Sequence, residues 1–281
     1  MSESNPHAFF EADWLSLREP ADHQARAMPL TDAAAEWLAR QAASRRRIVD
    51  LGAGRGSNMR YLAPRLPGPQ HWRLIDHDCA LLETVQASAH SLTDAHGAPV
   101  AIETQALDLT GDGLEAALAG SHLVTAAALF DLVTRAWIVR LAQACAAHAA
   151  AVLFVLSIDG HIDFAPASTD DAFITGLLGA HQHRDKSFGE ALGAHAPAVL
   201  QQAFEHEGYR ATLAKSAWYI DATRADLGAA LIDGWRGAAC EQAPEARARI
   251  NAWAAARTQS LQAGELSLTV GHQDLFATPS P

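Results

Sequence analysis

Short, continuously apolar runs alternate along the chain with segments whose apolar residues recur at helical spacing. The run 151–158 is almost wholly apolar, which is typical of a strand with helices on both faces. The segment 133–148 has apolar residues three and four positions apart, which predicts an amphipathic helix. We predict strands at 47–51, 71–75, 99–107, 121–129, 151–158, 209–220 and 266–276. Because helices separate most of them, the pattern predicts a doubly wound, seven-stranded and mostly parallel α/β sheet made of right-handed βαβ units.

Some segments depart from this alternation, namely 1–45, 160–196 and 222–263. Residues 8–30 show no clear period and predict short helices and turns, and Thr31 or Asp32 is placed to cap a helix that ends near Arg40. Helices are also predicted in the last segment, broken near Gly234, Gly237 and Pro244. We expect a single domain, 1–281, in which the three irregular segments form a helical cap on the substrate side, because caps of this kind usually enclose small ligands.

The composition favours a folded protein that does not bind nucleic acid. The chain has 281 residues, of which 49% are hydrophobic and 19% charged, enough for a packed core. Its formal net charge of -11 would repel a phosphate backbone. The three cysteines lie far apart, which indicates reduced thiols and a cytoplasmic location. The sequence contains no signal peptide pattern and no apolar stretch near ~20 residues, so we expect a soluble protein without a membrane partner. The oligomeric state is left open.

A glycine-rich loop follows the first predicted strand. Residues 50–58 read DLGAGRGSN, with glycines at alternate positions. Glycines let the backbone turn tightly and approach a ligand at the carboxyl end of a strand, where open α/β sheets bind their ligands. Dinucleotide-binding enzymes favour G-x-G-x-x-G or A in this place. Here Ser57 occupies the sixth position, and an acid, Asp50, precedes the glycines where it would oppose a pyrophosphate.

This loop resembles the first motif of class I S-adenosylmethionine (SAM)-dependent methyltransferases, in which an acid precedes the glycines. The resemblance implies a Rossmann-like methyltransferase fold with SAM as the cofactor. An acid at Asp50 suits the ammonium group of SAM, directly or through water. Asp76, at the end of the second strand, suits the ribose hydroxyls, although dinucleotide folds also place an acid there. From this part of the chain we expect contacts to SAM from Asp50, Gly52, Ala53, Gly54, Gly56, Asn58, Asp76 and His77.

Later segments extend the resemblance. Asp108, followed by Leu109, matches the position where an acid of the family accepts a hydrogen bond from the adenine amine. The segment 125–131, which contains Ala126, resembles the fourth motif, which passes beside the methyl-bearing sulfur. The segment 269–276 resembles the reversed final strand of the fold, which pairs beside the sixth. A chance match remains the alternative, in which the glycines make only a tight turn and the acids only cap helices.

Two residues are candidates for a general base, which helps when the methyl acceptor must lose a proton. Asp131 follows the fourth strand, but it is equally suited to cap the helix that starts near Val133. His181 belongs to the polar cluster 181–186 in the predicted cap, for which a solvated loop is the alternative. Asp131 and Asp159 together resemble the acids of metal-dependent catechol-type methyltransferases. Gly160 occupies the place of a further ligand of that family, so we expect no metal.

The substrate side is less defined by the sequence. Arg18 and Arg26 can hold a carboxylate of the cofactor or of the substrate, although surface ion pairs are the commoner role. An apolar substrate wall can come from Trp14, Trp218 and Trp235, although core packing is the commoner role. The remaining candidates for substrate binding are Asp159, His183 and Lys186. DNA amino-methyltransferases carry Asn or Asp before Pro-Pro-aromatic after the fourth strand, and the segment 128–131 lacks that sequence, which disfavours a nucleic-acid base as acceptor.

Taken together, the resemblance implies methyl transfer from SAM to a small molecule at an unspecified O, N, C or S atom. One alternative is an NAD(P)-dependent oxidoreductase on the same type of sheet. Another is a protein of the SAM-binding fold that acts as a non-catalytic partner.

Overall fold

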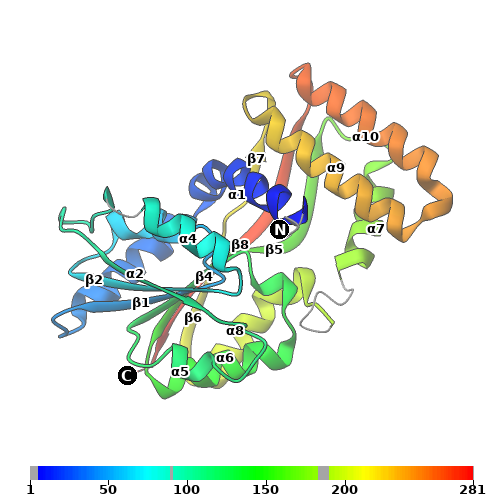
Figure 1. Cartoon of the computed structure of the whole chain (residues 1–281). Coiled ribbons are helices and arrows are strands. Elements are labelled where there is room, and N and C mark those ends of the chain that lie inside the picture. Colours follow the sequence, from blue (N-terminus) through cyan, green and yellow to red (C-terminus); the bar gives the residue numbers. More distant parts are fainter. Residues whose placement is uncertain (1–5, 89–90, 183–189, 281) are drawn as a thin grey trace, which may run out of the picture.

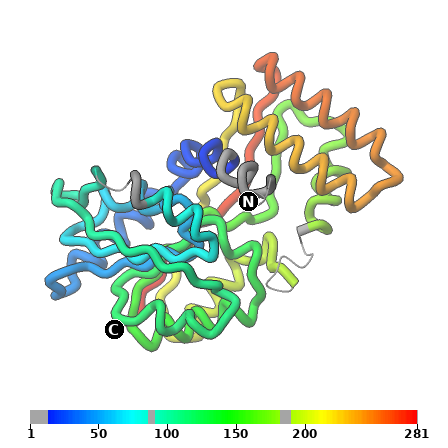
Figure 2. Tube along the Cα trace, viewed as in Figure 1, coloured from blue at the N-terminus to red at the C-terminus, as the bar shows by residue number. Residues whose placement is uncertain are grey.

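The structure is a computed structural model that describes residues 6–88, 91–182 and 190–280 (Figures 1 and 2). A sheet lies at its centre with helices on both faces, and a helical lobe built on α7, α9 and α10 stands at one end. The helices are α1 (Pro6–Ala25), α2 (Met28–Arg40), α3 (Ser57–Leu62), α4 (Cys79–Ser88), α5 (Leu114–Ala117), α6 (Arg135–Ala147), α7 (Asp171–Gln182), α8 (Ala196–His206), α9 (Ala225–Gln242) and α10 (Arg247–Gln262).

The sheet has the order β3-β2-β1-β4-β5-β8-β6, with β7 paired to β8. Strands β1 to β5 run parallel, whereas β8 runs antiparallel to both β5 and β6. The α/β class, the mostly parallel sheet and the reversed last strand beside the sixth are thus confirmed. The strand bounds are β1 (Arg46–Leu51), β2 (Gln70–Asp76), β3 (Ala101–Ala106), β4 (Leu123–Ala127), β5 (Ala151–Ala165), β6 (Tyr209–Lys215), β7 (Trp218–Ile220) and β8 (Ser267–Pro279).

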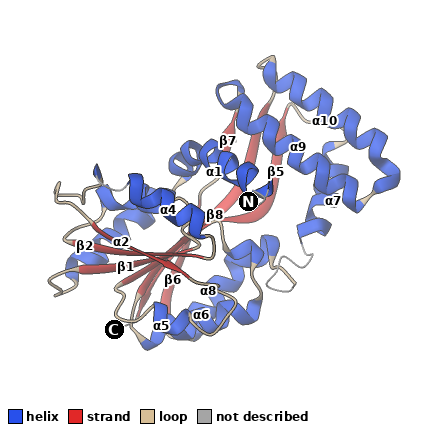
Figure 3. Ribbon diagram, in the orientation of Figure 1, coloured by secondary structure: helices blue, strands red, loops and turns tan. Residues whose placement is uncertain are grey.

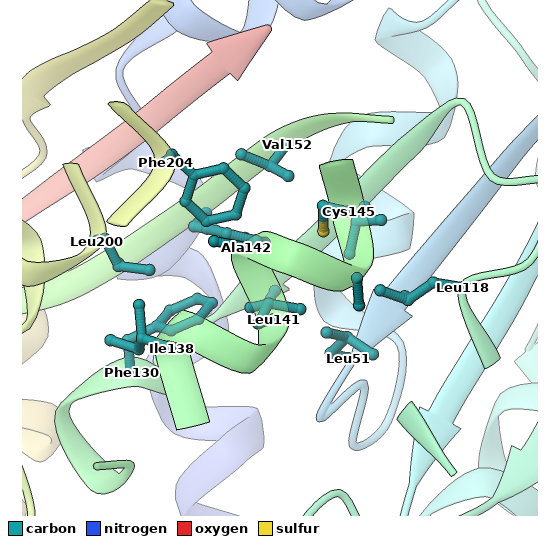
Figure 4. Close-up of a cluster of buried hydrophobic side chains, with 14 of the residues drawn as sticks. Leu51, Leu118, Phe130, Ile138, Leu141, Ala142, Cys145, Val152, Leu200 and Phe204 are labelled. Atoms are coloured by element: carbon teal, nitrogen blue, oxygen red, sulfur yellow. The ribbon is translucent and has the colours of Figure 1, made fainter. Parts of the chain in front are cut away.

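Alternate residues of the central strands pack on opposite faces of the sheet. Val152 and Phe154 of β5 contact the apolar cluster under α5, α6 and α8 (Figure 4). Leu153 and Val155 contact the cluster under α2, α3 and α4. Because successive side chains of a strand point to opposite faces, a sheet covered on both sides requires the continuous apolar runs seen in the sequence.

The helical lobe rests on an extension of the sheet. Strands β5 and β8 are 15 and 13 residues long, and their pairing continues from Val152↔Ala277 to Ala165↔Ser267, with two register shifts. The far part of this ladder, with β7, carries the third apolar cluster, which includes side chains of α7, α9 and α10. Figure 3 shows the strands running on from the central sheet into this lobe.

Several sequence-based boundaries were wrong. The predicted sixth strand is divided into β6 and β7, so the sheet has eight strands. Both pair with β8 in one register, and the amide of Ser216, between them, donates to the carbonyl of His272. Residues 8–25 form one helix rather than short turns. Neither Thr31 nor Asp32 caps α2, which begins at Met28 with a proline in its first turn and buries Thr31. Helix α9 continues through Gly234 and Gly237.

Among the described residues, no helix is both long and apolar enough to cross a membrane.

Candidate functional site

The glycine loop lies at the carboxyl end of β1, as expected. Gly52, Gly54 and Gly56 have φ angles of +62°, +51° and +75°. Side chains with a Cβ rarely adopt this region, so glycine is what allows the turn. The amide of Ala53 donates to the carbonyl of Ile75 at 3.0 Å, which ties the loop to the end of β2.

Asp76 supports this loop from β2. Its Oδ2 accepts a hydrogen bond from the amide of Gly54 at 2.8 Å, and its Oδ1 accepts one from the amide of Asp78 at 3.0 Å. The exposed ring of His77 lies beside it, with Nδ1 3.2 Å from Oδ1. Each carboxylate oxygen can accept a second hydrogen bond. Asp76 therefore keeps acceptor capacity for a ligand in the cavity that it lines.

A cavity of about 310 Å³ opens beside the loop, and we call it the loop cavity. Its wall comes from α1, the glycine loop, the end of β2, the end of β4 with the residues after it, and Leu156 within β5. The lining residues that matter for the argument are Arg18, Arg26, Gly52, Gly54, Asn58 and Asp76. Ala53 and His77 also line it.

Buried polar groups stand behind this cavity. Nη1 of Arg26 donates to Oδ1 of Asn58 at 2.8 Å, and Nδ2 of Asn58 donates to Oδ1 of Asp50 at 2.8 Å and to Oγ1 of Thr125 at 2.9 Å. Oδ2 of Asp50 and both Nε and Nη2 of Arg26 are buried without a hydrogen-bond partner. Unpaired buried charged atoms are costly. The side chains therefore offer one acceptor and two donors to a zwitterionic ligand.

Burial raises the pKa of Asp50 from 3.8 to about 7, against the opposing effects of the Asn58 hydrogen bond and of Arg26. A carboxyl whose charge is disfavoured by burial gains most from a cation placed beside it. Burial likewise lowers the pKa of Arg26, against the effect of Asp274.

Replacing Asp50 by asparagine should change the pH dependence of stability. The folded state holds the Asp50 proton more tightly than the unfolded state does, so this contribution to stability is present near pH 4 and is lost as the pH rises towards 7. Relative to the Asp50→Asn variant, which does not titrate there, the wild type should lose roughly 3 kcal/mol between pH 5 and pH 8. Urea unfolding of both proteins at the two pH values measures it. A difference between the proteins that stays constant with pH would contradict the raised pKa.

One face of α1 lines the loop cavity, and the sequence analysis missed most of its residues. Asp22 is bound by Arg18, with Nε to Oδ2 at 2.9 Å, and by the indole of Trp218, with Nε1 to Oδ1 at 3.1 Å. Nε2 of His23 lies 3.1 Å from Oγ of Ser57. Leu15, Arg18, Asp22 and Arg26 recur at helical spacing. This spacing indicates one helix with a cavity-facing side, whereas the mixed composition of residues 8–30 predicted short helices and turns.

A second cavity, of about 290 Å³, adjoins the first. We call it the tryptophan cavity, because Trp14, Trp218 and Trp235 line it. The two cavities share five lining residues, namely Trp14, Arg18, Ala128, Leu132 and Leu156. Ala128 and Leu156 have φ angles of +51° and +57°. Strained backbone of this kind collects at functional sites, and here it lies where the two cavities meet.

Of the two candidate bases, only Asp131 lines a cavity, the tryptophan cavity. Its alternative role as a helix cap is wrong, since Thr134 caps α6 and accepts from the amide of Trp137. His181 lies on α7, with Nε2 3.0 Å from Oε2 of Glu241, and lines neither cavity. The structure therefore gives no support to a catalytic role for His181.

Only some of the other candidates for substrate binding line a cavity. Trp14 and Arg18 line both cavities, and Arg26 lines the loop cavity. Asp159 lies within β5 rather than at its end, and its Oδ1 accepts from the amide of His161 at 3.0 Å. His183 and Lys186 lie outside the described residues. In the described part of the chain, no group of three or more His, Cys, Asp or Glu residues is arranged to hold a metal ion.

Three positions taken from the resemblance, Asp108, Leu109 and Ala126, do not line the loop cavity. Asp108 is exposed, and its Oδ1 accepts from the amide of Thr110 at 2.8 Å. Leu109 is buried in the core. Ala126 is also buried in the core, and its neighbours Ala127 and Ala128 line the cavity instead. Asp50 and Gly56 support the cavity from behind rather than line it.

No family model matches the sequence, and no curated protein matches it. The chain is similar to solved structures at low identity. One is a cyclopropane synthase from Mycobacterium tuberculosis, with 12% identity, 89% of this chain and 84% of that chain covered, and a TM-score of 0.48. Another is the geranyl diphosphate C-methyltransferase from Streptomyces coelicolor, with 14% identity, 88% and 79% covered, and a TM-score of 0.45. A third is a SAM-dependent methyltransferase from Geobacter sulfurreducens, with 15% identity, 92% and 93% covered, and a TM-score of 0.43.

The strand order and the loop carry the assignment of the fold. The last strand, β8, is reversed and pairs beside β6, as the resemblance implied. The glycine loop follows β1, and an acid ends β2. The chain has a Rossmann-like, doubly wound α/β fold.

Proposed function

We propose that this protein binds SAM in the loop cavity and transfers its methyl group to a small molecule held in the tryptophan cavity. The observation that carries the proposal is the pair of adjoining cavities, one backed by unpartnered buried charges and the other walled by tryptophans. Methyl transfer requires two ligands held in contact, and much of its rate can come from that positioning.

The groups around the loop cavity fit SAM in three places. Oδ2 of Asp50, behind the cavity, lacks a hydrogen-bond partner and would favour the ammonium group by its charge, and Arg26, which lines the cavity, would donate to the carboxylate through Nη2. Asp76 has acceptor capacity for the ribose hydroxyls. When bound, SAM supplies an electrophilic methyl group on a sulfonium.

The protein's own contribution is to position the ligands and exclude water. Leu132 and Trp14 stand between the two cavities and belong to both. Their apolar surfaces keep solvent from the contact between the two ligands. Arg18, held by Asp22, fixes the polar edge of the same boundary.

The same site disfavours a dinucleotide. A pyrophosphate would lie near the buried acid Asp50 at the loop, whereas Asp76 is compatible with either cofactor. Glycine-rich dinucleotide sites instead place the pyrophosphate at the start of a helix after a G-x-G-x-x-G loop. Here Gly56 falls one residue early, and the helix that follows, α3, has six residues.

Calorimetric titration of the purified protein tests the cofactor. We expect S-adenosylhomocysteine to bind with a dissociation constant of about micromolar order, ~8 kcal/mol, and NADH in a parallel titration not to bind. Binding of NADH alone would establish the oxidoreductase alternative. Binding of neither ligand to folded protein would favour a non-catalytic partner protein.

A further inference from the structure

We propose that the tryptophan cavity takes an uncharged aromatic acceptor whose hydroxyl group donates to Nε2 of His272, which then receives its proton. This rests on the proposed function. The sequence analysis gave His272 no role, and neither Asp131 nor His181 is required for the step.

The tautomer of His272 follows from its backbone contact. Nδ1 lies 3.0 Å from the carbonyl oxygen of Val270, at a position where the ring is buried in β8. A carbonyl only accepts, so Nδ1 carries the hydrogen, and Nε2 of the neutral ring carries the lone pair. His272 lines the tryptophan cavity. With this tautomer, the ring has an acceptor, and no acid, at Nε2 for a ligand there.

The imidazole is held neutral by its surroundings. Burial, and then the positive charge of Arg18, lower the pKa of His272 to about 4, against the carbonyl of Val270 and the carboxylate of Asp159. The tilted indole of Trp218, with ring centroids 4.8 Å apart, covers the imidazole. At pH 7 the lone pair is thus available in nearly every molecule.

The walls favour a flat apolar ligand. Trp14 and Trp218 meet edge to face with centroids 6.4 Å apart, and Trp235 lies on the opposite helix of the cap. Aromatic rings pair well with such walls. A volume of about 290 Å³ suits one or two fused rings.

A charged acceptor fits less well. Among the described residues lining this cavity, Arg18 is the only lysine or arginine. Its Nε and Nη2 donate to the carboxylate of Asp22, at 2.9 and 3.2 Å, so Asp22 already balances its charge. A ligand carboxylate would share that cation with Asp22 and would also meet Asp131 in the wall. An uncharged hydroxyl avoids both costs.

The step balances with His272 as the proton acceptor. The acceptor oxygen forms a bond to the methyl carbon, and the carbon–sulfur bond breaks with its electron pair left on sulfur. The hydroxyl proton passes to Nε2 and is later released to solvent. Because the sulfonium loses its charge while the imidazole gains one, total charge is conserved.

Equilibrium dialysis on protein saturated with S-adenosylhomocysteine tests the inference with three probes: 2-naphthol, 2-methoxynaphthalene and 2-naphthoate. We expect 2-naphthol to bind about 3- to 10-fold more tightly than 2-methoxynaphthalene, the effect of one neutral hydrogen bond, and also more tightly than 2-naphthoate. His272→Phe keeps the ring but lacks the lone pair, so the preference for 2-naphthol should fall to about 1-fold. His272→Gln should retain it, because the amide oxygen can accept. Trp235→Ala should weaken both uncharged probes alike.

Equal wild-type affinity for the two uncharged probes would overturn the proposal, as would a preference that persists in His272→Phe. Tightest binding of 2-naphthoate, or binding of no probe, would also overturn it. The wild-type comparison decides the matter even if His272→Phe does not fold. Titration of the same protein with S-adenosylhomocysteine distinguishes failure of the proposed function from failure of this inference. If S-adenosylhomocysteine does not bind, the proposed function is contradicted. If it binds but the probes behave otherwise than expected, only the inference about the acceptor is wrong.

Discussion

Replacing Asp76 by alanine should weaken the binding of S-adenosylhomocysteine by about 100-fold. Hydrogen bonds from two ribose hydroxyls to a carboxylate contribute about 1.5–3 kcal/mol, and each 1.4 kcal/mol is about tenfold in affinity. The variant also frees the amide of Gly54, which Asp76 now fixes at 2.8 Å. Calorimetric titration of variant and wild type measures the loss. If Asp76→Ala binds S-adenosylhomocysteine within about threefold of the wild-type affinity, Asp76 does not bind the ribose hydroxyls.

Asp108→Ala is the matched control for this experiment. Sequence resemblance paired Asp108 with Asp76 as a second cofactor acid, whereas the structure places its carboxylate on the surface, turned to Thr110. Hydrogen bonds from Thr110 lower the pKa of Asp108, so its carboxylate stays ionised and is already engaged with Thr110. We expect an affinity within about twofold of the wild type. If Asp108→Ala loses as much affinity for S-adenosylhomocysteine as Asp76→Ala does, Asp108 contacts the bound cofactor as the resemblance implied.

Replacing Asp274 by alanine should lower the free energy of unfolding by about 4 kcal/mol, because buried donors and a buried charge lose their partner. Oδ2 accepts from the amide of Ala27 at 2.9 Å, and Oδ1 accepts from the amide of Leu156 at 2.8 Å. Nε of Arg26 lies 3.9 Å from Oδ2, and both side chains are 1% exposed. One carboxylate on β8 thus joins β5, the turn before α2 and the end of α1.

Urea unfolding measures this loss, with Asp163→Ala as the control. Asp163 also stands in the β5–β8 ladder and pairs with His161 at 2.7 Å, but both side chains are more than half exposed. Exposed pairs contribute about 0–1 kcal/mol, so the control should unfold near the wild-type midpoint. A loss below about 1 kcal/mol for Asp274→Ala would show that the buried amides find other partners. Since Asp274 anchors the strained Leu156, we also expect this variant to bind S-adenosylhomocysteine less tightly.

The central sheet could be predicted well because its signal is local. β4 and the first half of β5 are continuous apolar runs, and β1 and β2 each contain a shorter apolar core that ends at a turn. Covering helices on both faces make that pattern unavoidable. The loop after β1 could be found for the same reason, since its glycines stand next to one another in sequence and must adopt positive φ.

The segments outside the central sheet were predicted less well, because their order comes from contacts between distant parts of the chain. Arg18 and Asp22 of α1 meet Trp218 of β7 only in the fold. β6 and β7 both pair with β8, which lies about fifty residues later in the chain. Asp108 shows the opposite failure, in which a position matched the motif but its side chain turned to its own loop.

The sequence by itself determined the α/β class, the order of strands and helices through β5, and the glycine loop with Asp50 and Asp76. These follow from periodicity and from the conformational freedom of glycine, which act over a few residues. Only the tertiary structure decided that Arg26, Asn58 and Asp50 form one buried network, that two cavities adjoin, and that His272 lines the second. Buried hydrogen bonds in this fold join residues as many as 247 positions apart, such as Ala27 and Asp274. A local sequence pattern does not indicate which distant groups will form such a bond.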